Sequence, residues 1–121
     1  MVGRIGRREQ FSHLRAHGFT VRDGGLRIRA ARLPEDAVGT GPAVAYSIGR
    51  GAGTAVRRNR LRRRLRAVFA NAEHDGRLHE GWYLVTVLPS SEEPAYAQLD
   101  SWASAALSMI FERLAAPGTG L

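Results

Sequence analysis

The sequence contains no cysteine and no lysine, and each absence excludes a class of function. Without cysteine the chain forms neither disulfides nor thiolate metal sites, which suits the reducing cytoplasm where we expect the protein to work. Without lysine it cannot contain a Walker A loop, whose lysine contacts nucleotide phosphates. No apolar run approaches the roughly 20 residues that a membrane-spanning helix needs, so we expect no membrane association.

All 18 basic residues are arginines, and they are concentrated in one segment. Eight of them lie between Arg50 and Arg66, where there is no acidic residue, and the other ten nearly balance the eleven acids. The net charge of +7 therefore belongs to this segment. Like charges at this density repel one another unless a polyanion binds them. A focused patch of planar guanidinium groups is typical of a nucleic-acid-binding protein.

The pattern of apolar residues and turn signals predicts one domain with the element order α-β-β-β-α-β-α. The predicted elements are a helix (7–17), strands (19–22, 26–33 and 43–48), a helix (54–72), a strand (82–88) and a final helix beginning at 94. They indicate an α+β fold, a two-layer sandwich with one sheet of about four strands packed by helices. We expect residues 1–121 to form a single domain, with its core over 5–115 and a flexible tail over 116–121.

The helix predicted after Thr54 has two different faces. At 100° per residue, Leu61, Leu65 and Phe69 share one arc, which is typical of a stripe that faces a core. The opposite face is polar and continuous, and we call it the arginine ridge: Asn59, Arg62, Arg63 and Arg66. Exposed helix faces normally interleave glutamate for i,i+4 ion pairs, and this one has none. A face that binds nucleic acid is therefore favoured over a merely solvated one.

Four further arginines of this helix lie outside the ridge, namely Arg57, Arg58, Arg60 and Arg64. Arg60 and Arg64 flank it. Arg58 points into the apolar arc, one turn before Leu61, and two interpretations remain open. Its stem either extends over the apolar surface toward solvent, or its guanidinium makes a specific contact with RNA or with the protein.

No arrangement of residues in the sequence is typical of catalysis. The stretch GRGAGTAV (49–56) lacks GxGxxG spacing, and no GxSxG occurs. His13 and His17 have the i,i+4 spacing of zinc ligands but no glutamate in the HExxH place, which favours a surface histidine pair. The acids are scattered, with no pair placed for acid–base or two-metal chemistry. We therefore expect no catalytic residue and no metal site in the protein.

The stretch YSIGRGAGTAVRRNRLRRRLRAVF (46–69) resembles the signature of the bacterial ribonuclease P protein component. The matching signature positions are Gly53, Ala55, Val56, Arg58, Asn59, Arg60, Leu61, Arg62, Arg63, Leu65 and Arg66. Other matches follow in chain order, namely Arg7, Arg8, Phe11, Gly18, the YLV strand (83–85), Pro94, Tyr96 and Leu99. The resemblance covers about residues 5–115.

This resemblance implies the fold predicted above, with a left-handed crossover, and a role as the protein subunit of ribonuclease P. In such proteins the catalyst is a magnesium-dependent RNA, which cleaves precursor tRNA to make the mature 5′ end. The protein binds that RNA, and it holds the single-stranded 5′ leader in a cleft between the sheet and the first helix. The implied partners are the catalytic RNA and precursor tRNA, with no obligate protein partner, and Mg²⁺ is bound mainly by the RNA.

The resemblance also assigns site residues. Those implied to bind the RNA subunit are Arg50, Arg57, Arg58, Asn59, Arg60, Arg62, Arg63, Arg64 and Arg66. Those implied to line the leader cleft are Phe11, Arg15, Arg29 and Thr54. Arg15 and Arg29 stand where the family often has aromatic residues, and Gly49-Arg50-Gly51 replaces the usual Ser-Lys-Lys. We therefore expect somewhat weaker RNA and leader contacts than average, but the same function.

Two other classes of function use similar arginines. One is a non-catalytic RNA-binding protein of another kind, such as a ribosomal protein or an assembly factor. The other is a DNA-binding or membrane-active protein. The arginine helix alone would permit both, but the spacing from Phe11 to Gly18 and the pattern of the closing helix would then be coincidences.

Overall fold

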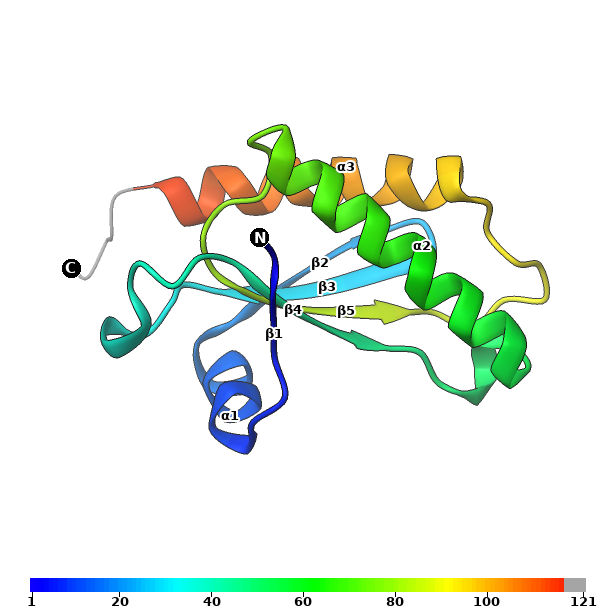
Figure 1. Ribbon diagram of the computed structural model, residues 1–121, viewed down its shortest axis with the longest axis horizontal. Coiled ribbons are helices and arrows are strands. Elements are labelled where there is room, and N and C mark those ends of the chain that lie inside the picture. The colour runs from blue at the N-terminus through cyan, green and yellow to red at the C-terminus, as the bar shows by residue number, and fades with distance from the viewer. Residues whose placement is uncertain (117–121) are drawn as a thin grey trace.

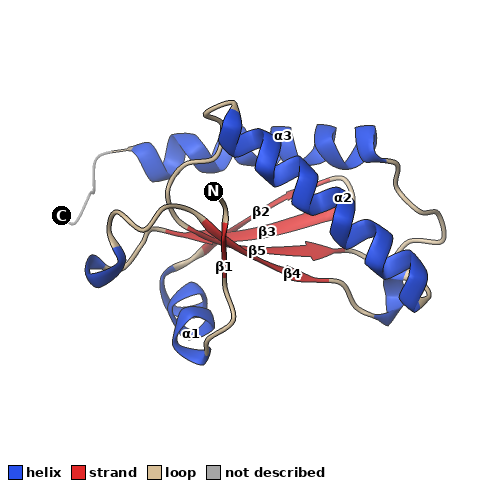
Figure 2. Ribbon diagram, viewed as in Figure 1, coloured by secondary structure: helices blue, strands red, loops and turns tan. Residues whose placement is uncertain are grey.

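The computed structural model describes residues 1–116, which form three α-helices and one five-stranded sheet (Figures 1 and 2). The helices are α1 (Arg8–His17), α2 (Ala55–His74) and α3 (Tyr96–Ala115), and the strands are β1 (Gly3–Arg4), β2 (Phe19–Asp23), β3 (Leu26–Ala31), β4 (Ala43–Ser47) and β5 (Trp82–Val87). The predicted α-β-β-β-α-β-α order is confirmed, and β1 adds a short strand that the sequence pattern missed. The predicted flexible tail lies, except for Ala116, outside the described residues.

The strands run in the spatial order β1-β4-β5-β3-β2. β2, β3 and β5 pair antiparallel, whereas β4 pairs parallel with both β1 and β5. Parallel neighbours need a crossover connection, and α2 provides it between β4 and β5. The basic helix is therefore the link that brings the two strands β4 and β5 together. The left-handed sense of this crossover stays a prediction from the resemblance.

Helices cover both faces of the sheet, to different extents (Figure 1). α2 and α3 pack side by side over one face and enclose the larger core with it, whereas α1 covers part of the other face. The side chains of β3 alternate between the two faces, because Leu26 and Ile28 lie in the larger core while Arg27 and Arg29 belong to the α1 side. Part of the α1 side of the sheet is thus left for polar and charged residues.

The local signals of α2 act as predicted. The Thr54 side chain accepts a hydrogen bond from the backbone N–H of Arg57 at 3.2 Å and so caps the helix. Gly53 precedes it with φ of 116°, a conformation that favours glycine. Leu61, Leu65 and Phe69 are fully buried, which confirms the core-facing stripe. The arginine face of α2 is consequently held in a fixed orientation above the sheet.

The β2–β3 hairpin and α3 lock together through one aromatic side chain. The two strands join through a turn at Asp23-Gly24-Gly25, with Gly24 at φ of 53°. The Trp102 indole lies so close to this turn that a Cβ atom on Gly24 would come within 2.1 Å of its Nε1.

No helix in the described part of the chain is both long and apolar enough to cross a membrane.

Candidate nucleic-acid interface

The arginine ridge lies on the solvent side of α2, as its helical positions predict. Asn59, Arg63 and Arg66 are exposed, and Arg62 is half-buried. Within the ridge, Arg62 Nη1 donates a hydrogen bond to Asn59 Oδ1 at 3.2 Å. Within residues 1–116 no carboxylate is ion-paired with the ridge arginines. The ridge therefore presents positive charge that the described protein leaves uncompensated.

The other side of α2 carries a group of ion pairs that we call the Glu93 cluster, formed by Arg57, Arg60, Arg64 and Glu93. Arg60 Nε and Nη2 donate to the two carboxylate oxygens of Glu93 at 2.9 and 2.7 Å, a bidentate pair. Arg64 Nη1 donates to the same carboxylate at 2.7 Å and to the Pro94 carbonyl at 2.9 Å. Arg57 donates to the carbonyls of Ser90 and Ser91, at 3.2 Å each, and its Nε lies 3.9 Å from Glu93.

This cluster strongly favours the ionised form of Glu93. The hydrogen bond from Arg60, together with the charges of Arg60 and Arg64, lowers the pKa of Glu93 to about 2. One acid thus neutralises one of three arginines and orients all three toward the loop between β5 and α3. The sequence gives no local signal for this pairing, because Glu93 lies 33 residues after Arg60.

The arginines of α2 therefore divide by side. Those predicted to bind RNA include Arg57, Arg60 and Arg64, whose guanidinium groups the structure places against the loop at 90–94. Their RNA contacts stay a prediction, and each would require the guanidinium to share or exchange a protein partner. Arg58 is half-buried, and its Nε is shielded from solvent with no hydrogen-bond partner within residues 1–116. Arg50 is exposed in the short 3₁₀ turn before α2.

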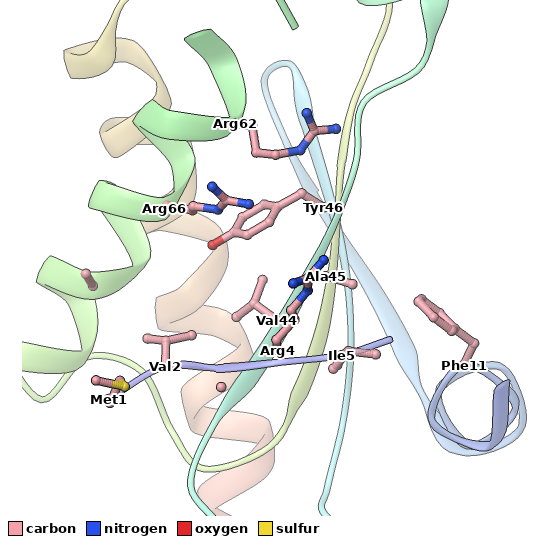
Figure 3. Close-up of a pocket in the computed structure, with 12 residues that line it drawn as sticks. Met1, Val2, Arg4, Ile5, Phe11, Val44, Ala45, Tyr46, Arg62 and Arg66 are labelled. Atoms are coloured by element: carbon pink, nitrogen blue, oxygen red, sulfur yellow. The ribbon is translucent and has the colours of Figure 1, made fainter. Parts of the chain in front are cut away.

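A hollow of about 590 Å³ separates the ridge from β1 and β4, and we call it the Tyr46 pocket. Its charged and aromatic lining residues are Arg4, Phe11, Tyr46, Arg62 and Arg66. Figure 3 shows Arg62 and Arg66 reaching from α2 toward the Tyr46 side chain, with Arg4 on β1 and Phe11 on α1. The pocket thus brings together three guanidinium groups and two aromatic rings from four elements.

The Tyr46 ring is fixed between the core and this charge. It meets the Phe69 ring edge-on, at 6.0 Å between centroids. Burial raises the pKa of Tyr46 to about 12, against the opposing effect of the Arg66 charge, so the hydroxyl stays a neutral donor and acceptor. Neither Tyr46 nor Arg4 was predicted as a site residue. Their common feature, a place on neighbouring strands, emerges only when β1 pairs with β4.

Three of the four residues implied for a leader cleft lie on or beside α1, and Thr54 lies apart from them at the start of α2. Phe11 lines the Tyr46 pocket, whereas Arg15 is exposed on the last turn of α1. Arg29 caps the end of α1, since its guanidinium donates to the carbonyls of Leu14, Arg15 and Gly18 at 2.7 to 2.9 Å. Thr54 caps α2. The structure therefore gives Arg29 and Thr54 structural roles, and their leader contacts stay predictions.

Histidines and acids do not gather into a metal-binding group in the part of the chain that the structure describes. The predicted surface pair, His13 and His17, lies with its ring centroids 4.8 Å apart, and His13 Nε2 is 2.8 Å from the Arg32 carbonyl oxygen.

The fold and this surface define a small α+β protein of the nucleic-acid-binding class. The chain matches the family model described as Ribonuclease P over residues 3–113, and it belongs to this family. It is accordingly a protein subunit of ribonuclease P, within the class of RNA-binding proteins that act in tRNA processing. A search of curated proteins gave no match.

Solved structures of two bacterial proteins have the same fold. The RNase P protein of Staphylococcus aureus superposes with a TM-score of 0.74 at 16% identity, covering 91% of this chain and 96% of that one. The RNase P protein of Thermotoga maritima superposes with a TM-score of 0.67 at 18% identity, covering 88% of this chain and 96% of that one. The fold is thus shared at low sequence identity.

Proposed function

We propose that the protein binds the catalytic RNA of ribonuclease P through the arginine ridge and holds the 5′ leader of precursor tRNA beside Phe11. The observation that supports this most directly is the division of α2. Glu93 draws Arg57, Arg60 and Arg64 toward the loop after β5, while the ridge keeps its charge free within the described chain. Free guanidinium groups in a row along a rigid helix match the repeating phosphates of an RNA backbone.

The ridge offers more than charge. Arginine presents several N–H donors in a fixed plane, which allows bidentate contact to a phosphate. Asn59 adds an amide that donates and accepts, so it can contact a base edge or a ribose hydroxyl as well as a phosphate. Because the helix is anchored by Leu61 and Leu65 in the core, these groups are held in position before RNA arrives.

Phe11 supports the second half of the proposal. It is half-buried on α1 and lines the Tyr46 pocket, where Arg62 and Arg66 lie across from it. An aromatic ring accepts any base by stacking, which suits a leader whose sequence varies between precursors. Arg62 and Arg66 belong to the ridge and also line the pocket. A leader held at Phe11 would therefore lie next to the catalytic RNA bound at the ridge.

We place the catalytic centre in the RNA, with Mg²⁺ bound mainly there. The charged groups of the arginine ridge are guanidinium donors, which remain protonated at any physiological pH and therefore cannot shuttle protons in catalysis. They neutralise phosphate charge and orient the two RNAs. The cytoplasmic location, the catalytic RNA and precursor tRNA as partners belong to the same proposal.

Reconstitution tests the proposal. The protein is mixed with a bacterial ribonuclease P RNA at a Mg²⁺ concentration too low for the RNA alone, and cleavage of precursor tRNA is measured. We expect stimulation by the protein, and no cleavage by the protein without RNA. Arg62→Gln/Arg66→Gln should reduce the stimulation more than Arg22→Gln/Arg27→Gln, which removes the same charge from exposed positions outside the pocket. No stimulation, with tight binding to unrelated structured RNA, would favour the alternative of a different RNA-binding role.

A further inference from the structure

A second cationic hollow lies on the other side of α1. It has a volume of about 380 Å³, within the range of about 300–1,000 Å³ that small-ligand sites occupy, and we call it the His13 pocket. Its charged and aromatic lining residues are His13, His17, Phe19, Arg32 and Arg113. His13 follows Phe11 by two residues, which places it on the opposite side of the helix. α1 therefore separates this hollow from the Tyr46 pocket.

The His13 pocket is lined by basic groups and by no acid. Its basic lining side chains come from α1, from Arg32 directly after β3, and from α3. Within residues 1–116 neither Arg32 nor Arg113 is ion-paired with a carboxylate. Basic side chains from three parts of the chain thus surround one concave surface, and an anion bound there is attracted by each of them.

Both arginines are fixed in place by the fold. Arg32 Nη2 donates to the carbonyls of Arg113 and Ala116, at 2.9 and 3.0 Å, which leaves Nε and Nη1 without a bond to the described protein. The guanidinium carbon of Arg113 lies 4.0 Å from the centre of the Phe19 ring. Stacking uses the flat face of a guanidinium and leaves its N–H edge available to a ligand.

The histidine pair supplies flat surfaces beside this charge. The His13 ring is oriented by its contact with the Arg32 carbonyl at 2.8 Å and by an edge-on contact with Trp82 at 5.3 Å. His17 lies 4.8 Å from His13 between centroids and is exposed, so one side of the pair remains accessible. Rings next to fixed guanidinium groups are the combination that binds single-stranded nucleic acid, where bases stack and phosphates pair with charge.

We propose that the His13 pocket is a second RNA-binding site, which takes a phosphate and its adjoining base from a single-stranded segment. This site is separate from the arginine ridge and from the Tyr46 pocket, and it requires no catalytic RNA for binding. Its occupant is single-stranded because a duplex would present its phosphates but keep its bases stacked away from the His17 ring.

Nuclear magnetic resonance on the whole protein tests this directly. The probe is a short, 5′-phosphorylated oligouridylate, and the readout is the set of histidine ring protons. Signals of His13 and His17 are expected to shift as the probe is added, while His74, which lines neither pocket, stays unchanged. If His13 and His17 do not move, or if His74 moves equally, the proposal is wrong. Equal affinity for inorganic phosphate would overturn the assignment to RNA.

Matched variants separate the site from general charge. Arg113→Gln/His17→Gln is expected to weaken binding, followed at His13, by roughly tenfold, about the contribution of one charge-assisted hydrogen bond. Arg22→Gln removes one charge from an exposed position outside both pockets and should leave the His13 titration unchanged. Similar losses in both variants would mean diffuse attraction and would refute a defined site.

The same titration distinguishes this site from the proposed function. Arg62→Gln/Arg66→Gln should abolish most binding to the catalytic RNA but leave the His13 titration in place. If that variant also removes the shift at His13, the oligonucleotide binds at the ridge and the second site does not exist. A failed reconstitution with intact His13 shifts would overturn the ridge proposal and leave this one standing.

Discussion

Replacing Arg62 and Arg66 together by glutamine is expected to weaken binding to the catalytic RNA far more than replacing Arg60 and Arg64 together. Both double variants remove the same formal charge from the same helix, so long-range attraction falls equally in both. They differ in what the replaced guanidinium groups touch. Arg62 and Arg66 line an open pocket, whereas Arg60 and Arg64 donate hydrogen bonds to Glu93 at 2.7 to 2.9 Å.

The magnitude follows from how many phosphates the variant protein no longer neutralises. Each neutralised phosphate adds about 0.7–0.9 to the slope of log affinity against log salt concentration, so neutralising two fewer should reduce the slope by about 1.4–1.8. Affinity at moderate salt should fall by about 10- to 100-fold, as expected for two exposed charge-assisted hydrogen bonds. For Arg60→Gln/Arg64→Gln we expect less than half of that change in slope, because these groups already have a carboxylate partner.

The assay is filter binding or fluorescence anisotropy with the catalytic RNA, repeated over a series of KCl concentrations at fixed Mg²⁺. Thermal unfolding of each variant serves as the control, since Arg60 and Arg64 also tie α2 to the loop before α3. Equal slopes for the two double variants, both folded, would refute the reasoning. The Glu93 cluster would then open on binding, and all arginines of α2 would contact phosphate.

Three further predictions rest on other parts of the structure. Glu93→Gln should reduce the acid sensitivity of folding. Because the pKa of Glu93 is lowered to about 2, its carboxylate stabilises the fold fully above pH 4.5 and loses this effect as the pH falls toward 2. Unfolding temperatures measured across that pH range should therefore vary less in the variant than in the unmodified protein. Phe11→Ala should cost ~1–3 kcal/mol in binding of leader-bearing precursor and nothing for mature tRNA; equal losses would remove Phe11 from the leader site. In denaturant unfolding, Gly24→Ala should lower the free energy of unfolding by about 2 kcal/mol or more, because φ is positive there and the new Cβ atom would collide with Trp102. Gly76→Ala should lower it by only about 1 kcal/mol, because φ is 72° but no atom lies within 4 Å of the new Cβ atom.

Most of the fold could be predicted because its signals are local. The Asp23-Gly24-Gly25 turn fixes a hairpin, and Thr54 marks the start of α2 within one residue. In α3, Ile110 is buried while its neighbour Met109 is 49% exposed, as the helical repeat requires. Helical periodicity alone also separates the arginine ridge from the buried stripe. β1 escaped prediction because two residues have no periodicity and pair only once β4 is in place.

The site was predicted less completely, for a physical reason. Helical geometry predicts the direction in which an arginine side chain points, but it does not predict which residue that side chain contacts. Glu93 meets Arg60 from the loop between β5 and α3, and the carbonyls that Arg29 caps lie at the end of α1. Arg4 reaches the Tyr46 pocket through an edge strand. Such partners are decided by tertiary packing, which leaves no pattern in the sequence near the arginine concerned.

The shortness of β1 has a consequence for the motion of the Tyr46 pocket. β1 forms one wall of this pocket. Few backbone hydrogen bonds attach it to β4 and the residue before β4, including Gly3 N–H to the Pro42 carbonyl at 2.8 Å and Ile5 N–H to the Val44 carbonyl at 3.3 Å. A strand held by few hydrogen bonds opens more easily than the central strands, although the buried side chain of Ile5 resists this opening. Separation of β1 would move Arg4 outward while Arg62, Arg66 and Tyr46 stay anchored to α2 and β4. The proposed leader site thus has one wall that is easier to move than the other, and we expect this wall to adjust to bases of different size.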